Sequence, residues 1–260
     1  MKKYILGPCL LESYELAFHI LRSLSFKVNT RDFYFKASFD KANRSSNGER
    51  GLGLEKSVEI FKQLKKDFPG ISITTDVHEV HQLDKLEGVV DLVQIPAFLC
   101  RQTDLIVESA RRFEEVNIKK GQWMAPTNMV KVLDKIKTKH PSTKVYLTER
   151  GTSFGHEKLI VDFSTVDYFK SYFDGVYFDV GHSTHINKPN GRIGGDRDLA
   201  KKYFQTGFGF GYDGIFAEIH PTPDTALSDS ESTLELFWVL DQISPVYRSN
   251  RLHYPISSKV

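Results

Sequence analysis

The sequence predicts one α/β domain folded as a closed (β/α)8 barrel, and three observations support this fold class. Short apolar runs typical of buried strands alternate with amphipathic helical segments eight times along the chain. A length of 260 residues is normal for one such barrel. No linker, low-complexity segment or sequence repeat divides the chain, so residues 1–260 are expected to form a single barrel domain.

The expected strands are short, rich in apolar and aromatic residues, and bounded by polar or glycine-containing segments. In chain order they are 4–6, 33–35, 71–75, 89–95, 116–118, 145–147, 176–178 and 214–217. Eight strands in a chain of this length favour a closed barrel over an open sheet.

Each expected strand is followed by a segment with helical periodicity. These segments are 12–24, 54–68, 80–86, 103–113, a stretch around 130–136, 162–172, 198–205 and a final helix after residue 217. The pair Pro69-Gly70 ends the second helix. In the last helix, Leu234, Phe237 and Leu240 are expected to face inward.

Composition narrows the function classes. Apolar residues make up 40% and charged residues 26%, as in a packed globular protein. A net charge of +2 gives no support for nucleic-acid binding, so any basic site must be local. Gly7 and Pro8 interrupt the apolar start, and no stretch is long enough to span a membrane. With Cys9 and Cys100 as the two cysteines, we expect a cytoplasmic protein without membrane or nucleic-acid partners.

Charged or polar side chains follow every expected strand, and in a (β/α)8 barrel these strand ends meet at the face that carries active sites. The loop 36–46 combines cations with amide and hydroxyl donors, which suits a phosphate, although alone it is more simply a solvated basic loop. Eight converging strand ends predict a site. Their residues are, in order, Cys9, Lys36 and Lys41, Asp76 and His78, Gln94 and Arg101, Lys119, Glu149 and Arg150, Asp179 and His182, and Glu218.

Some of these side chains have the chemistry of metal ligands. Cys9, His182 and Glu218 supply a thiolate, an imidazole and a carboxylate, and Asp229 after the eighth strand could be a fourth ligand. This mixture suits zinc, iron or manganese better than magnesium or calcium. The spacing matches no local metal motif, and each residue alone has a simpler explanation, such as a small buried cysteine.

A second set consists of cations around the same expected mouth. They are Lys36, Lys41, Arg44, Arg101, Lys119 and Arg150. Six cations exceed what one phosphate requires, so we expect two anionic substrates or one substrate with two anionic groups. A nucleic-acid groove would need basic runs interleaved with stacking aromatic residues, and the lysine pairs at 65–66 and 201–202 are more simply solvated helix faces.

Seven segments occur in a familiar order along the chain. They are KASFDKANRSS at 36–46, TDVHE at 75–79, QIPAFLCRQ at 94–102, NIKKGQ at 117–122, TERGTSFG at 148–155, DVGHS at 179–183 and EIHPTPDTALSD at 218–229. Together they resemble the 3-deoxy-D-manno-octulosonate 8-phosphate synthase family over almost the whole chain. The KANRSS segment discriminates, because the related heptulosonate 7-phosphate synthases typically carry a KPRTS-like sequence there.

This resemblance implies a homotetrameric barrel that condenses phosphoenolpyruvate with D-arabinose 5-phosphate and releases inorganic phosphate, in lipopolysaccharide precursor synthesis. It also implies a divalent metal, zinc, iron or manganese. Metal-dependent members carry Cys after the first strand and metal-independent members carry Asn, and this chain has Gly7-Pro8-Cys9. The implied ligands are Cys9, His182, Glu218 and Asp229.

The resemblance also implies roles for the remaining residues. His182, Asp229, Lys119 and Lys41 are the implied catalytic residues. For substrates, Lys119 and Arg150 hold the phosphoenolpyruvate phosphate and Lys41 lies near its carboxylate. Asn43, Arg44 and Ser45 grip the pentose phosphate, helped by Arg101 of a neighbouring subunit. Lys36, Asp76, His78 and Gln94 line the same pocket.

The chain departs from the family pattern mainly around the sugar site. The segment 47–51 is shortened by one residue, Gly181 stands where a threonine is usual, and 156–158 and 184–196 diverge apart from Gly194-Gly195. Two alternatives therefore stay open. One is a synthase of the same superfamily that uses another aldose phosphate, such as erythrose 4-phosphate. The other is a non-catalytic phosphosugar-binding relic, against which the intact cations and candidate ligands argue.

Overall fold

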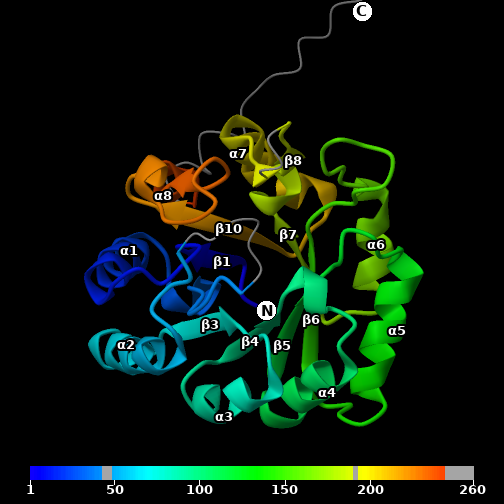
Figure 1. Ribbon diagram of the computed structural model, residues 1–260, viewed down its shortest axis with the longest axis horizontal. Helices are drawn as coiled ribbons and strands as arrows, with labels where there is room; N and C mark the ends of the chain where they lie inside the picture. Colours follow the sequence, from blue (N-terminus) through cyan, green and yellow to red (C-terminus); the bar gives the residue numbers. More distant parts are fainter. Residues whose placement is uncertain (43–48, 190–192, 244–260) are drawn as a thin grey trace, which may run out of the picture.

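The computed structural model describes residues 1–42, 49–189 and 193–243, which form one closed barrel (Figure 1). Eight strands pair side by side in parallel, and the pairing of β1 with β10 closes the sheet. The predicted fold class is therefore confirmed. The barrel strands are β1 (Tyr4–Gly7), β2 (Phe33–Lys36), β3 (Ser72–Asp76), β4 (Leu92–Ile95), β5 (Glu115–Lys119), β6 (Lys144–Glu149), β7 (Gly175–Asp179) and β10 (Gly214–His220).

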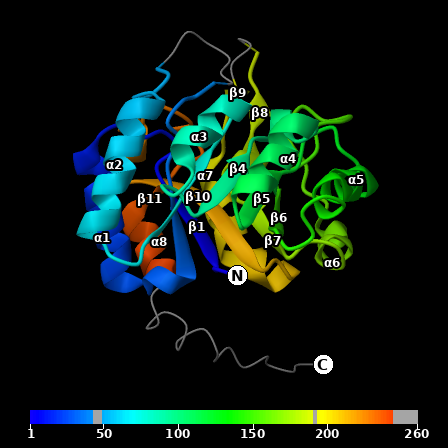
Figure 2. The ribbon, with the colours of Figure 1, turned by 90° about the horizontal axis from the view of Figure 1, so that it is seen from below.

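Helices surround the sheet and cover its outer face (Figures 1 and 2). They are α1 (Tyr14–Lys27), α2 (Leu54–Asp67), α3 (Leu83–Leu86), α4 (Thr103–Arg112), α5 (Pro126–Lys137), α6 (Val166–Lys170), α7 (Arg197–Thr206) and α8 (Leu236–Ile243). The predicted strand 89–95 begins only at Leu92, and the predicted helix 162–172 shortens to a 3-10 turn followed by α6. No helix among the described residues is long and apolar enough to cross a membrane.

The inward face of α8 differs from the expectation. Phe237 is 61% exposed, and Leu234 is buried in the short strand β11 (Leu234–Glu235), which pairs with the end of β10. The helix begins only at Leu236, so Leu234 is not part of it and cannot define which helical positions face inward. That face consists of Leu236, Val239, Leu240 and Ile243.

The barrel interior is packed with side chains at the end where the strands begin. Ile5, Tyr34, Leu92, Tyr146, Tyr177 and Phe216 form one buried cluster there, separate from the larger core between sheet and helices. The hydroxyls of Tyr34 and Tyr146 donate to Glu115, and that of Tyr177 donates to the Lys2 carbonyl. This aromatic layer, in which the tyrosine hydroxyls have hydrogen-bond partners, closes one end of the barrel and leaves the opposite end for polar groups.

A small antiparallel ladder stands in the long loop after β7. It pairs β8 (Ile186–Asn187) with β9 (Ile193–Gly194), and neither strand is predicted by the sequence pattern. Gly194 ends the ladder and Gly195 follows it. They pack against Lys188, Glu231 and Ser232, where a Cβ on either glycine would collide with these neighbours. The ladder and its glycines thus form one wall over the carboxyl ends of the strands.

Candidate active site

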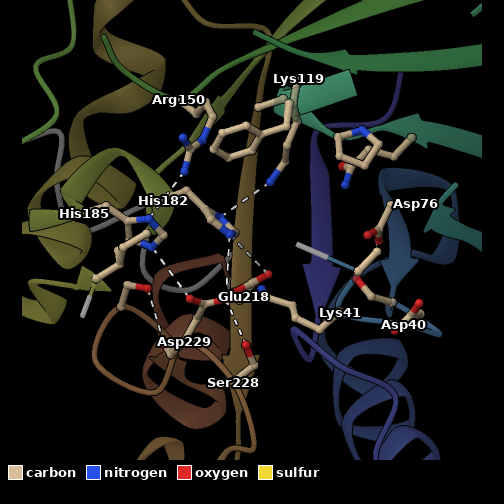
Figure 3. Close-up of a pocket in the computed structure, with 18 of the residues that line it drawn as sticks. Asp40, Lys41, Asp76, Lys119, Arg150, His182, His185, Glu218, Ser228 and Asp229 are labelled. Atoms are coloured by element: carbon tan, nitrogen blue, oxygen red, sulfur yellow. Dashed lines mark hydrogen bonds and ion pairs between the residues drawn. The ribbon is translucent and has the colours of Figure 1, made fainter. Parts of the chain in front are cut away.

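A cavity of about 820 Å³ opens at the carboxyl ends of the barrel strands (Figure 3). Strand register brings these ends to one level, since Gly7 pairs with Glu218, Asp76 with Gln94 and Lys119 with Thr148. Many of the predicted site residues line this cavity. They are Lys36, Lys41, Asp76, His78, Gln94, Lys119, Arg150, His182, Glu218 and Asp229.

The four predicted metal ligands lie close together, in two overlapping groups that share Asp229. The ligand atoms of Cys9, Glu218 and Asp229 all lie within 4.8 Å of one another. His182 Nε2 is 3.8 Å from Glu218 Oε1 and 3.9 Å from Asp229 Oδ2. A thiol, an imidazole and two carboxylates are thereby brought together by β1, β7, β10 and the loop after β10. This donor set fits zinc, iron or manganese.

Lys41 supplies the positive charge within this group. Its Nζ lies 3.0 Å from Cys9 Sγ and forms an ion pair with Asp229. Burial and the neighbouring Glu218 carboxylate raise the pKa of the Cys9 thiol well above its usual value. The thiol accordingly donates to Asp229 Oδ2 over 3.2 Å. A bound divalent cation would compensate these negative groups and favour the thiolate.

His182 is oriented by Asp179 at the end of β7. The ring Nδ1 lies 2.9 Å from Asp179 Oδ2, and the His182 backbone N–H donates to Asp179 Oδ1 over 2.9 Å. The carboxylate is fully buried. Because it accepts the Nδ1 proton, Nε2 is left bare toward Glu218 and Asp229. Burial would raise the pKa of Asp179, but the neighbouring His182 and Lys119 outweigh it and hold the pKa well below its usual range.

Asp229 sits in a left-handed backbone conformation with φ of +50°. It is the one non-glycine residue with positive φ among residues 1–42, 49–189 and 193–243. The backbone N–H groups of Ser232 and Thr233 both donate to its carbonyl over 3.0 Å. These bonds hold the loop in an uncommon conformation that turns the carboxylate into the cavity, which is typical of functional sites.

Buried cations stand beside the candidate metal ligands, on the side of the two histidines (Figure 3). Lys119 Nζ donates to Asp179 over 2.6 Å and lies 3.8 Å from the centre of the Phe216 ring. Arg150 is only 5% exposed, and burial lowers its pKa, although a guanidinium stays charged. Its Nη1 has no hydrogen-bond partner among the described residues. A buried donor of this kind calls for an acceptor, and an anion in the cavity would supply one.

Side chains at the ends of β2, β3 and β4 form another wall of the cavity. Lys36 Nζ donates to Ser38 Oγ over 2.6 Å and to the Cys9 carbonyl over 3.1 Å, and lies 3.6 Å from Asp76. Asp76 also lies 3.4 Å from His78 Nε2. Burial would raise the pKa of Asp76, but the Lys36 charge lowers it well below its usual range. Gln94 completes this wall and accepts from Asn117 over 3.3 Å.

The remaining predicted residues lie apart or outside the description. Arg101 is exposed between β4 and α4 and does not line the cavity. Asn43, Arg44 and Ser45 fall in 43–48, outside the described residues. Sequence reasoning missed His185, which lines the cavity three residues after His182. The spacing of two histidines in DVGHSTH was the available signal, but 184–196 was interpreted only as a divergent loop.

Comparison with known proteins identifies the family of the chain. Residues 2–245 match the DAHP synthetase I family. A 2-dehydro-3-deoxyphosphooctonate aldolase of Helicobacter hepaticus is 43% identical over 256 residues, covering 93% of this chain and 94% of the relative. The enzyme of the same description from Wolinella succinogenes is 44% identical over 244 residues, covering 88% of this chain and 92% of the relative.

A solved structure shows the same fold. The phospho-2-dehydro-3-deoxyheptonate aldolase of Thermotoga maritima superposes with a TM-score of 0.79 at 24% identity, covering 93% of this chain and 67% of its own. At this identity the likeness concerns the fold alone.

The barrel and its charged cavity define a (β/α)8-barrel enzyme with its site at the carboxyl ends of the strands. The extent of the sequence matches shows that the chain belongs to the DAHP synthetase I family, among relatives that are 2-dehydro-3-deoxyphosphooctonate aldolases.

Proposed function

We propose that the protein is a 3-deoxy-8-phosphooctulonate synthase. It condenses phosphoenolpyruvate with D-arabinose 5-phosphate and water, and forms 3-deoxy-D-manno-octulosonate 8-phosphate and inorganic phosphate. The observation that carries the proposal is one cavity holding buried cations beside a thiol, imidazole and carboxylate group. This cavity occurs in a chain 43% identical to a 2-dehydro-3-deoxyphosphooctonate aldolase over nearly its whole length.

Lys119 and Arg150 are proposed to bind the phosphate of phosphoenolpyruvate. Both are nearly buried, so their charges act where water screens little. The partnerless Nη1 of Arg150 supports this role, because a phosphate oxygen would satisfy it. Lys41 is proposed to lie near the carboxylate of the same substrate, since its ammonium already stands beside Asp229 at the cavity centre.

The sugar phosphate is proposed to occupy the wall formed by Lys36, Asp76, His78 and Gln94. Asn43, Arg44 and Ser45 would grip its phosphate, as the resemblance to the octulosonate family implies. Arg101 is exposed, as required of a residue that serves the cavity of a neighbouring subunit in a homotetramer. A cytoplasmic location and a role in lipopolysaccharide precursor synthesis complete this proposal.

Cys9, His182, Glu218 and Asp229 are proposed to hold a divalent zinc, iron or manganese ion, as in the metal-dependent class. Such an ion supplies Lewis acidity toward an oxygen of the substrate or of water. Asp179 supports the site from behind, because it keeps the His182 proton on Nδ1 and leaves Nε2 as the donor atom.

The protein's own part in the reaction is to bring two anions together. In the proposed reaction C3 of the enol attacks the sugar aldehyde, water adds to C2, and the C2–O bond to phosphate then breaks. Both substrates carry phosphate, so they repel each other in solution. The buried cations offset this repulsion, and their fixed positions orient the reacting carbons. Charge compensation and orientation are the two ways in which these residues lower the activation barrier.

Release of phosphate from phosphoenolpyruvate tests the function directly. We expect release that depends on arabinose 5-phosphate, with ribose 5-phosphate and erythrose 4-phosphate as matched alternatives. Preferred turnover of erythrose 4-phosphate would support the heptulosonate alternative instead. Binding of both substrates without phosphate release, in the metal-loaded protein, would support a non-catalytic phosphosugar-binding protein.

A further inference from the structure

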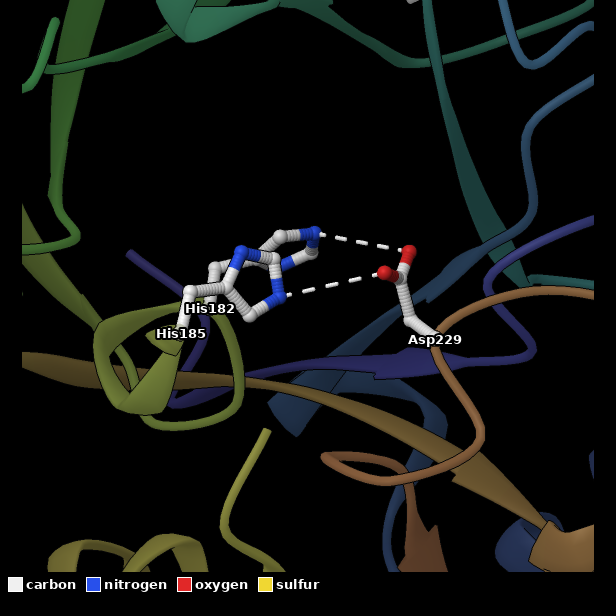
Figure 4. Close-up of side chains that lie close together, drawn as sticks. All are labelled: His182, His185 and Asp229. Carbon is white, nitrogen blue, oxygen red and sulfur yellow. Dashed lines mark ion pairs between the residues drawn. The ribbon is translucent and has the colours of Figure 1, made fainter. Parts of the chain in front are cut away.

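His185 lies between Arg150, of the proposed phosphate-binding group, and Asp229, of the proposed metal-binding group (Figure 3). Figure 4 shows its ring beside the Asp229 carboxylate. Its side chain is 13% exposed, and its two ring nitrogens face different partners. Nδ1 is 3.4 Å from Arg150 Nη2, and Nε2 is 3.8 Å from Asp229 Oδ1. Its backbone is fixed as well, since its N–H donates to the His182 carbonyl and its carbonyl accepts from Leu159.

The chemistry of Arg150 determines which ring nitrogen carries the proton. A guanidinium has only N–H donors, so the nitrogen that faces it must be bare and accept. In a neutral ring the proton is then on Nε2, the nitrogen that faces the Asp229 carboxylate. Both ends of the imidazole therefore face complementary groups.

The same assignment argues against His185 as a metal ligand, although His182, His185 and Asp229 lie close enough to form a ligand group. A ligating Nε2 would have to be bare, which would move the proton to Nδ1 and set it against the guanidinium. Coordination by His185 would therefore break the contact with Arg150.

We propose that His185 is a positioning residue that links Arg150 to Asp229. Its Nδ1 accepts from Nη2 of the guanidinium, which leaves Nη1 for the phosphate. Its Nε2 faces the Asp229 carboxylate and helps to fix the position of that group. The inference rests on the proposed function, because the phosphate and metal roles of these two residues come from it.

The test measures the effect of His185 on phosphate binding and on metal binding separately, in purified full-length protein. Affinity for inorganic phosphate is measured in the metal-free protein, and affinity for Co²⁺ and its visible absorption are measured without phosphate. The variants are His185→Leu, which removes both polar ends, and His185→Gln, which keeps one acceptor and one donor. His220→Leu is the matched control, because His220 is also buried, accepts from Thr222 over 3.0 Å and lies outside the cavity lining.

His185→Leu is expected to weaken phosphate binding about tenfold, the loss expected for one hydrogen bond to a charged group. It should weaken Co²⁺ binding about threefold, a smaller loss because the 3.8 Å contact is longer than a hydrogen bond. His185→Gln should restore both affinities, His220→Leu should change neither, and the shape of the Co²⁺ absorption should be the same in every variant.

Three results from the variants would overturn the inference alone. Unchanged affinities in His185→Leu would show that the ring positions nothing. Failure of His185→Gln to restore either affinity would reduce the residue to packing. An altered Co²⁺ absorption in both variants would make His185 a ligand. If the unaltered protein bound neither phosphate nor Co²⁺, the proposed function itself would fail, and the inference with it.

Discussion

Replacing Asp179 by Asn should show how strongly metal binding depends on the residue that orients His182, while the proposed ligands themselves are kept. The carboxylate is fully buried and accepts from Lys119 Nζ over 2.6 Å and from the His182 ring over 2.9 Å. Asn keeps the size and one acceptor oxygen but removes the charge and places an amide N–H beside two donors. Asp179 is not one of the proposed ligands, so the substitution removes none of their donor atoms.

Two magnitudes follow from these contacts. Removing one partner of a buried ion pair costs about 3–5 kcal/mol, because Lys119 keeps a buried charge without its carboxylate. Loss of a residue that orients a metal-binding histidine typically lowers metal affinity by about 10- to 100-fold. We therefore expect a marked loss of stability together with weaker metal binding in Asp179→Asn.

Urea unfolding of the metal-free protein and Co²⁺ titration of the folded variant would measure the two effects. Asp174→Asn is the matched control, because Asp174 also accepts a backbone N–H over 2.8 Å and pairs with Lys137, at the other end of the barrel. It is 37% exposed, so the loss should be only about 1 kcal/mol with metal affinity unchanged. Equal metal affinity in Asp179→Asn and the unaltered protein would refute the reasoning about His182.

The remaining predictions concern the ligands, the sugar site and pH. A chelator should abolish activity and zinc, iron or manganese should restore it, whereas activity indifferent to chelation would remove the metal proposal. Cys9→Asn should alter metal content measured by elemental analysis, and an unchanged content would show that Cys9 is not a ligand. Arg44→Ala should weaken arabinose 5-phosphate binding far more than phosphoenolpyruvate binding in calorimetry; equal losses would contradict the division of the site. Because Asp76 and Asp179 have depressed pKa values in the folded state, their contribution to the free energy of unfolding should persist above about pH 5 and decline below about pH 4, as the unfolded carboxyls take up protons. Urea unfolding at pH 3.5 and 7 checks this, and equal stability at both would contradict it.

The barrel was predictable because its signals are local and repeated. Each strand is an apolar run and each major helix has its own apolar face, so eight units could be recognised without any knowledge of their contacts. The exception is instructive. Phe237 was expected inside, but β11 ends at Glu235 and resets the helical register, and pairing of a two-residue strand leaves no periodic signal.

The site was predictable in part for a different reason. Residues that end parallel strands are brought together by the fold, so Lys36, Lys119 and Glu218 could be grouped from strand positions alone. His185 follows no barrel strand directly, because it closes a 3-10 turn that begins at His182. Its contacts with Arg150 and Asp229 depend on how two loops fold, and sequence periodicity does not report that.

The path of the bridging oxygen of phosphoenolpyruvate tests the central claim most directly. With ¹⁸O in the oxygen between C2 and phosphorus, the protein would be incubated with arabinose 5-phosphate and both products examined by mass spectrometry. The proposed condensation predicts that the label leaves with inorganic phosphate and that an eight-carbon phosphosugar forms without it. Label retained in pyruvate or in the sugar product, with unlabelled phosphate, would contradict the account.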